Sequence, residues 1–195
     1  MNREFSIGLI YNLSLLLVLS LIFSIVNTRI EKAKGLRDVL AGVLIGIIGI
    51  AIMGNPVFFV EGVFFDGRSI LLSMTGLFFG IIPTMIAVLM TGFYRLLVGG
   101  GGALAGLATI LTSSFIGFVW RKYRLQKYVL DKMYFPAIEL YIFGIVVHMA
   151  MLVDLYIFLP QQNDTLSIVA LPIITLYPIA SVFLGLIIKS QIDKT

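Results

Sequence analysis

Long apolar stretches separated by short polar connectors dominate the pattern of the chain. An apolar segment of about 18 residues or more is long enough to cross a hydrocarbon core about 30 Å thick. We therefore predict an all-α fold, a polytopic transmembrane helix bundle in which the first span is retained and is not a cleaved signal peptide. The predicted full spans are Ile7–Val26, Leu36–Gly54, Leu104–Trp120, Ala137–Leu159 and Ile168–Ile188.

A sixth hydrophobic segment lies between Arg68 and Arg95 and admits two paths. Gly76, Gly80 and Pro83 interrupt it near its middle, which would leave two helical arms of about 18 Å each, somewhat over half the hydrocarbon core. A broken or re-entrant segment would return both arginines to one side, and such breaks are tolerated where protein or water covers the freed backbone groups. A single kinked helix would instead make six full spans, with one arginine at each interface.

The distribution of basic residues favours the segment that turns back. Lysine and arginine are enriched on the cytoplasmic side of membrane proteins. A single crossing divides the 14 basic residues nine against five, whereas a return divides them eleven against three and brings the basic loops 29–37 and 121–132 to the same side. We therefore expect a multi-pass protein of the inner (plasma) membrane with the N-terminus outside, the C-terminus in the cytoplasm, and both arginines at the outer face.

Composition excludes several function classes. The chain is 59% hydrophobic, and its net charge of +4 resides in short loops without interleaved aromatic residues, which argues against nucleic-acid binding. The absence of cysteine from the sequence excludes disulfides and thiolate chemistry. The sequence contains neither a nucleophile–base–orienter pattern nor a helical metal-ligand spacing. We expect no catalytic residue in this fragment, no metal site and no cofactor.

Polar residues near the predicted outer face form the candidate ligand-binding site. Two guanidinium groups at the mouth of a partly desolvated pocket hold a carboxylate or phosphate through bidentate hydrogen bonds, so Arg68 and Arg95 indicate a small organic anion. Asn55 and Asp66 lie in the connector before Arg68. Thr109 could add a hydroxyl contact, although such hydroxyls in lipid usually bond to their own helix. The alternative for Arg68 is an interfacial anchor paired with Asp66.

His148 is the single histidine and lies near the middle of a predicted span. An ionisable group at this depth is costly and often functional, so we consider His148 a possible proton or polar switch. The alternative is a neutral histidine bonded to a neighbouring helix. Glu139 is expected near the inner end of the same span, where it reaches water.

Glycines indicate close packing and one connector. Gly42 and Gly46 have the four-residue spacing that lets two helices approach closely in lipid. The run Gly99–Gly102 is interpreted as a flexible connector into a tightly packed helix, because no GK[ST] sequence follows it and no strand precedes it.

Two long blocks carry a family resemblance: NPVFFVEGVFFDGRSILLSMTGLFFG, and, after a proline, FYRLLVGGGGALAGLATILTSSFIGFVWRK. Together they resemble the five-transmembrane receptor domain of the LytS and YhcK type (5TMR-LYT), over roughly Leu36–Ile188. The resemblance implies a bacterial or archaeal signal-transduction receptor whose output is a histidine kinase or a diguanylate cyclase, and it implies small carboxylate signals. The family's arginine motifs fall on Asp66 with Arg68 and on Tyr94 with Arg95. The spacing of glycine and proline around residues 80–83 departs from the family pattern, which concerns the shape of the turn.

These observations predict a transmembrane signal-input domain that binds a small anion, such as a carboxylate, from the outer face and relays it through the last helix. We expect an N-terminal helix and cytoplasmic loop over residues 1–35, a sensor domain over 36–188, and a cytoplasmic tail over 189–195 leading to an output domain. The expected partners are the anion, membrane lipids, the output domain in cis and, through the family, a second copy in a homodimer. The alternatives are a transporter or substrate-capturing permease subunit, and a ligand-free sensor of membrane state.

Overall fold

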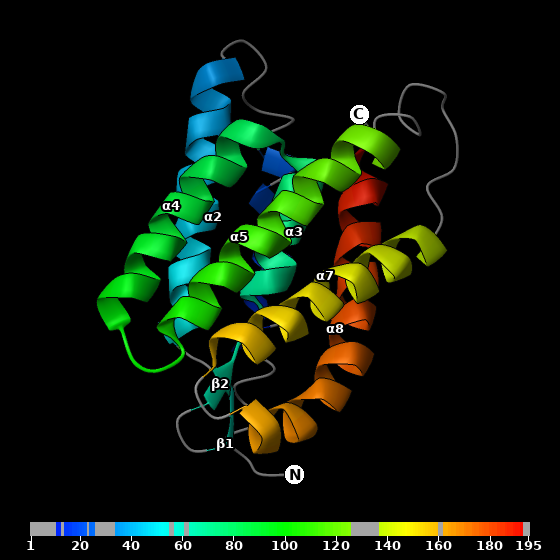
Figure 1. Cartoon of the computed structure of the whole chain (residues 1–195). Coiled ribbons are helices and arrows are strands. Elements are labelled where there is room, and N and C mark those ends of the chain that lie inside the picture. The colour runs from blue at the N-terminus through cyan, green and yellow to red at the C-terminus, as the bar shows by residue number, and fades with distance from the viewer. Residues whose placement is uncertain are drawn as a thin grey trace.

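A computed structural model of the chain describes residues 11–12, 14–22, 24–25, 34–54, 57–60, 63–125, 137–159 and 162–192. The described part is a helical bundle with a two-stranded β-hairpin at one end (Figure 1). The described residues between 11 and 25 are helical, and we call them the N-terminal helical segment. The other elements are α2 (Lys34–Gly54), β1 (Val57–Val60), β2 (Val63–Phe65), α3 (Arg68–Phe78), α4 (Ile81–Val98), α5 (Ala103–Trp120), the π-helical turn η1 (Arg121–Leu125), α7 (Ala137–Phe158) and α8 (Gln162–Ile192).

The predicted transmembrane bundle is confirmed. Five helices in the described ranges are long and apolar enough to cross a membrane, and four of them, in α2, α5, α7 and α8, coincide with predicted spans. The fifth is α4, which belongs to the segment between the two arginines. The first predicted span, 7–26, is helical at its described residues, and its other residues lie outside the described ranges.

The segment between Arg68 and Arg95 turns back, as the charge distribution predicts. The chain breaks at Gly80, whose φ of 91° and ψ of −168° are accessible essentially to glycine alone. The arms are unequal: α3 has 11 residues and α4 has 18, whereas the sequence suggested two similar arms. Pro83 lies in the first turn of α4, where its missing amide hydrogen removes no helical bond. Both arginines line one cavity, which excludes the single kinked helix.

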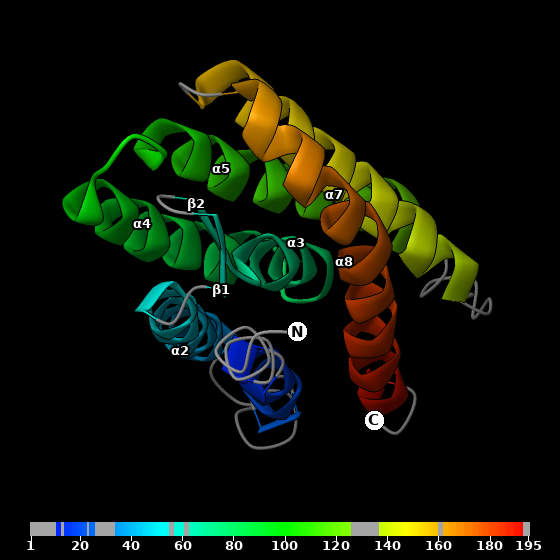
Figure 2. The same ribbon diagram turned by 90° about the horizontal axis from the view of Figure 1, so that it is seen from below.

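The short helix α3 is the centre of the bundle. Every residue from Ser69 to Phe78 is buried, and α3 contacts α2, α4, α5, α7 and α8 (Figure 2). Since neighbouring helices cover it on all sides, a helix only about 16 Å long is acceptable at membrane depth. Its tightest contact is with α5. A Cβ atom added at Gly76 would lie 2.7 Å from the carbonyl oxygen of Ser114, and one at Gly117 would strike the backbone of Ser73. Gly76 is therefore a packing residue and does not interrupt the segment, contrary to the sequence interpretation.

Glycines also set the contact between α2 and α4. A Cβ at Gly42 would lie 3.0 Å from the Cα of Pro83, and one at Gly46 would lie 3.0 Å from the Cβ of Met90. The close packing predicted from their spacing is confirmed.

The two ends of the bundle differ in their residues. The end that we call the hairpin end holds β1 and β2, the start of α3, and the α4–α5 connector (Figure 1). The strands pair antiparallel, with Val57 opposite Phe65, and they lead directly into Asp66. This hairpin is an addition to the predicted helices, and its valines and phenylalanines suit a strand. The opposite end, which we call the basic end, holds the start of α2, the α3–α4 turn, η1 and the end of α8.

Candidate functional site: an arginine cavity at the start of α3

A cavity of about 100 Å³ lies at the hairpin end, and we call it the arginine cavity. Arg68 enters it from the start of α3, and Arg95 enters it from the end of α4. The glycine connector, α5 and α7 form the remaining walls. The lining consists of Asp66, Arg68, Ser69, Arg95, Gly99, Gly100, Gly101, Gly102, Ala105, Gly106, Thr109, Ile110, Met151, Leu155 and Leu159.

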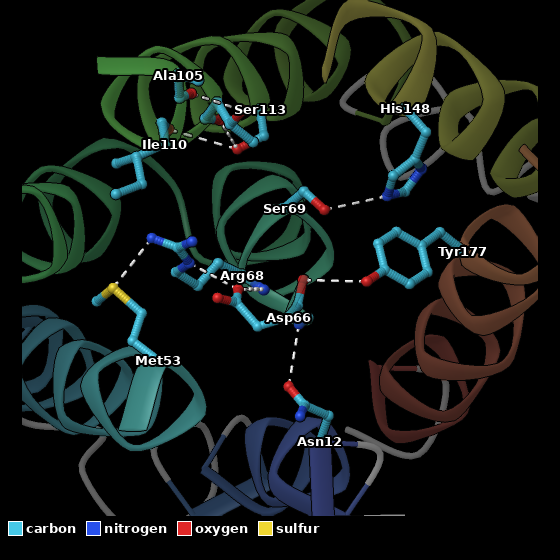
Figure 3. Close-up of polar contacts among 12 residues, drawn as sticks. Asn12, Met53, Asp66, Arg68, Ser69, Ala105, Ile110, Ser113, His148 and Tyr177 are labelled. Atoms are coloured by element: carbon cyan, nitrogen blue, oxygen red, sulfur yellow. Dashed lines mark hydrogen bonds and ion pairs between the residues drawn. The ribbon is translucent and has the colours of Figure 1, made fainter. Parts of the chain in front are cut away.

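Arg68 forms an ion pair with the acid that precedes it. Its Nε donates to Oδ1 of Asp66 at 2.6 Å, and its backbone N–H donates to the same oxygen at 3.0 Å (Figure 3). A further N–H group of Arg68 donates to the sulfur of Met53 at 3.0 Å. The side chains of Arg68 and Asp66 are only 11% and 1% exposed. The other carboxylate oxygen of Asp66, Oδ2, is buried and has no hydrogen-bond partner among the described residues. Arg68 is therefore paired with Asp66, as in the alternative of an interfacial anchor, but the pair lies in the wall of a cavity.

Arg95 is held against a surface of glycines. Its side chain is buried, and Nη1 donates to the carbonyl of Gly99 at 2.7 Å. A Cβ atom at Gly106 would lie 2.6 Å from Nε, and one at Gly102 would lie 3.5 Å from Nη2. The connector Gly99–Gly102 is thus a wall of the cavity, a role that the sequence interpretation missed. The spacing in the sequence could have indicated this role, because Gly99 follows Arg95 by one helical turn.

The remaining predicted ligand residues have different surroundings. Thr109 lines the cavity, but its hydroxyl donates to the carbonyl of Ala105 on its own helix at 3.0 Å. Asn55 lies outside the described residues. Asn12, which the sequence did not single out, accepts a hydrogen bond from the backbone N–H of Gly67 at 3.1 Å. The N-terminal helical segment therefore supports the turn that carries the cavity's acid.

His148 connects the start of α3 to α7 and α8. Its Nδ1 lies 2.6 Å from the carbonyl of Gly144, and because a carbonyl only accepts, Nδ1 carries a hydrogen. Its Nε2 lies 3.2 Å from the hydroxyl of Ser69 on α3. The imidazole meets the ring of Tyr177 edge-on at 5.1 Å between centroids, and the Tyr177 hydroxyl donates to the backbone carbonyl of Asp66 at 3.4 Å (Figure 3). A neutral imidazole that accepts from Ser69 satisfies this geometry, and the switch role stays a prediction.

The other end of α3 is closed by side chains from the basic end. Nη1 of Arg121 donates to the carbonyls of Leu77 and Phe78 at 2.9 and 2.7 Å, placing a cation at the negative end of the helix dipole. Glu139 does not face water as predicted. Its side chain is 6% exposed and accepts two hydrogen bonds from Arg124, at 2.8 and 2.7 Å, and one from Nε1 of Trp120 at 2.9 Å.

The arginine cavity has the chemistry of a small anion site. Two guanidinium groups and the positive end of α3 face one carboxylate, so the lining carries a net positive charge. Within the described ranges, no three His, Asp or Glu side chains gather where they could hold a metal ion. The cavity is also well below the roughly 300–1,000 Å³ of pockets for drug-sized molecules, so it suits a ligand of a few heavy atoms.

Comparison with protein families gives a match over most of the chain. The family described as 5TMR of 5TMR-LYT matches residues 20–191. Comparisons with curated proteins and with solved structures give no match. The match covers the cavity, both arginines, the helices α2, α3, α4, α5 and α7, and α8 as far as residue 191, and the chain therefore belongs to the 5TMR-LYT family of membrane sensor domains.

Proposed function

We propose that this domain is the signal-input module of a histidine kinase or diguanylate cyclase and that it binds a small organic anion, such as a carboxylate, in the arginine cavity. The observation that carries the proposal is the convergence of Arg68, Arg95 and the N-terminus of α3 on one small cavity opposed by a single acid, Asp66. The guanidinium fork matches a carboxylate in a bidentate manner. The family supports the role of a sensor.

The proposed orientation places the hairpin end outside the cell. Among the described residues, six basic residues lie at the basic end and two lie at the hairpin end, and basic residues are enriched on the cytoplasmic side. The anion then enters from outside, and α8 ends in the cytoplasm, where an output domain would follow. The six are Lys34, Arg37, Arg121, Lys122, Arg124 and Lys189, and the two are Arg68 and Arg95.

The proposed relay runs from Asp66 to α8. An anion that binds Arg68 competes with Asp66 for the same guanidinium and alters the turn whose carbonyl Tyr177 contacts. Tyr177 directly precedes Pro178, which lacks the amide hydrogen needed for a regular helical bond. The helix α8 changes direction along its length (Figure 2). The ligand-free and ligand-bound states could therefore differ in the angle of this bend. The anion shifts the equilibrium between these states only by its differential affinity for them.

Calorimetric titration of the purified chain with a panel of small carboxylates tests the proposal. Arg95→Ala removes a charged hydrogen-bond donor and should weaken binding about 10- to 100-fold, from the roughly 1.5–3 kcal/mol of a hydrogen bond to a charged group. Gly106→Ala should also weaken binding, because it displaces the Arg95 side chain without changing the charge. Gly35→Ala is the matched control, since a Cβ there meets nothing within 4 Å.

Unchanged binding in both Arg95→Ala and Gly106→Ala would contradict the site. Uptake of the labelled anion into vesicles would instead indicate the transporter alternative.

A homodimer is part of the proposal through the family, and cross-linking of the full-length sensor in its native membrane tests it.

A further inference from the structure

A second and larger cavity lies at the opposite end of α3. It has a volume of about 530 Å³ and sits at the α3–α4 turn, between the start of α2 and the end of α5. We call it the basic-end cavity. Its lining shares no residue with the arginine cavity, so an occupant here would bind at a site separate from that of the proposed anion.

Three cations and one acid line the basic-end cavity. Arg37 is paired with Asp38, with 3.3 Å between Nε and Oδ1, and the two side chains remain 26% and 14% exposed. Arg121 is held in place because Nη1 donates to the end of α3, while its Nε and Nη2 lie beside Gly80, at 3.7 and 3.9 Å from where a Cβ would be. Lys122 is exposed and adds an ammonium group, which lies over the ring of Tyr123 at 5.6 Å from its centroid. The lining therefore carries a net charge of +2 at neutral pH.

The backbone adds to this positive potential. The 18-residue helix α4 begins at the cavity, and its N-cap residue, Gly80, supplies no side-chain cap. Its first turn contains no acidic residue that would offset the dipole. Helix N-termini and arginine forks both favour the oxygens of a phosphate group.

The walls of the basic-end cavity are apolar on the side of α4. Ile81 and Ile82 line the cavity and are 50% and 45% exposed. In a membrane-spanning bundle such side chains meet acyl chains. An occupant that carries a phosphate next to hydrocarbon chains can contact both the cations and the isoleucines. A soluble phosphate would contact the cations alone.

We propose that the basic-end cavity binds the phosphate headgroup of an anionic membrane lipid. Basic pockets between transmembrane helices are known to take such headgroups. The lipid phosphate lies between Arg37, Arg121 and Lys122, and its acyl chains follow the outer face of α4 from Ile81.

Binding of short-chain phosphatidylglycerol to the purified chain in detergent, followed by native mass spectrometry and by thermal shift, tests this assignment. Phosphatidylcholine of the same chain length and inorganic phosphate are the comparison probes. The double variant Arg37→Gln with Lys122→Gln should weaken phosphatidylglycerol binding about 25-fold, at roughly fivefold for each cation near a lipid surface. Arg121 is left intact because it also caps α3.

Lys189→Gln is the matched control, because it removes a cation at the same end of the bundle but outside the cavity lining. Preference for phosphatidylglycerol over phosphatidylcholine, lost in the double variant and retained in the control, is the expected result. Equal binding of the two lipids, or equal loss in the control, would overturn the site. Inorganic phosphate that competes at the same concentration as the lipid would overturn the assignment to a lipid.

Discussion

At the scale of the residue, Asp66 has two roles that oppose each other. It orients Arg68 through Oδ1, which keeps a buried guanidinium compensated, and it also occupies the group that a ligand anion would bind. Its Oδ2 is buried without a hydrogen-bond partner among the described residues, so this acid is incompletely satisfied where it stands. A single substitution at Asp66 can therefore shift the competition between this carboxylate and an incoming anion for Arg68.

The variant Asp66→Asn should separate these roles. Removal of the carboxylate charge leaves Arg68 less compensated, which should lower the free energy of unfolding without ligand by about 1–3 kcal/mol. The same change removes the competitor, so a carboxylate that binds the arginine cavity should bind more tightly. Thermal shift with and without ligand measures both effects. A variant that is less stable and also binds more weakly would show that Asp66 is only a support for Arg68.

At the scale of the element, the lengths of the apolar segments and the distribution of basic residues predicted most of the fold. The local sequence pattern could not predict the rest. Apolar length identified α2, α5, α7 and α8, and the distribution of lysine and arginine identified the returning segment. Hydropathy could not show that α3 is enclosed by protein, because buried and lipid-facing apolar residues look alike in sequence. The contacts of Asn12 with Gly67 and of Tyr177 with Asp66 join positions 55 and 111 residues apart, beyond any local periodicity.

The contact between α3 and α5 predicts a large effect from a small change. Gly117→Ala would place a methyl group against the backbone of Ser73, and because backbone cannot rotate away, the two helices must separate. We expect a loss of about 1–3 kcal/mol in the free energy of unfolding, as is typical of overpacking. Gly35→Ala on α2 should be neutral or stabilising by up to about 1 kcal/mol. Denaturation in detergent compares the pair, and equal stability of the two variants would contradict the close contact.

At the scale of the whole molecule, the fold fixes which residues share an end, and the proposed orientation adds which end faces outward. The connector between α4 and α5 belongs to the hairpin end, and η1 belongs to the basic end (Figure 1). Reagents that reach only one face of a membrane can therefore examine both statements in one experiment.

Single cysteines provide this experiment, because the chain contains none of its own. Gly101 and Lys122 are both exposed and lie at opposite ends. A membrane-impermeant maleimide applied to intact cells should label Gly101→Cys, and it should label Lys122→Cys only after permeabilisation. The reverse pattern would contradict the proposed orientation, and labelling of both from the same face would contradict the arrangement of α4 and α5.

The contact between Gly76 and Gly117 also determines which parts of the bundle must travel together. Interdigitated side chains absorb a small shift by changing rotamer, whereas touching backbones do not. Arg121 ties the last carbonyls of α3 to the end of α5 and makes a second fastening. The two helices are thus joined along their length between the arginine cavity and the basic-end cavity, and we expect a movement of α3 at the first cavity to displace Arg121 at the second.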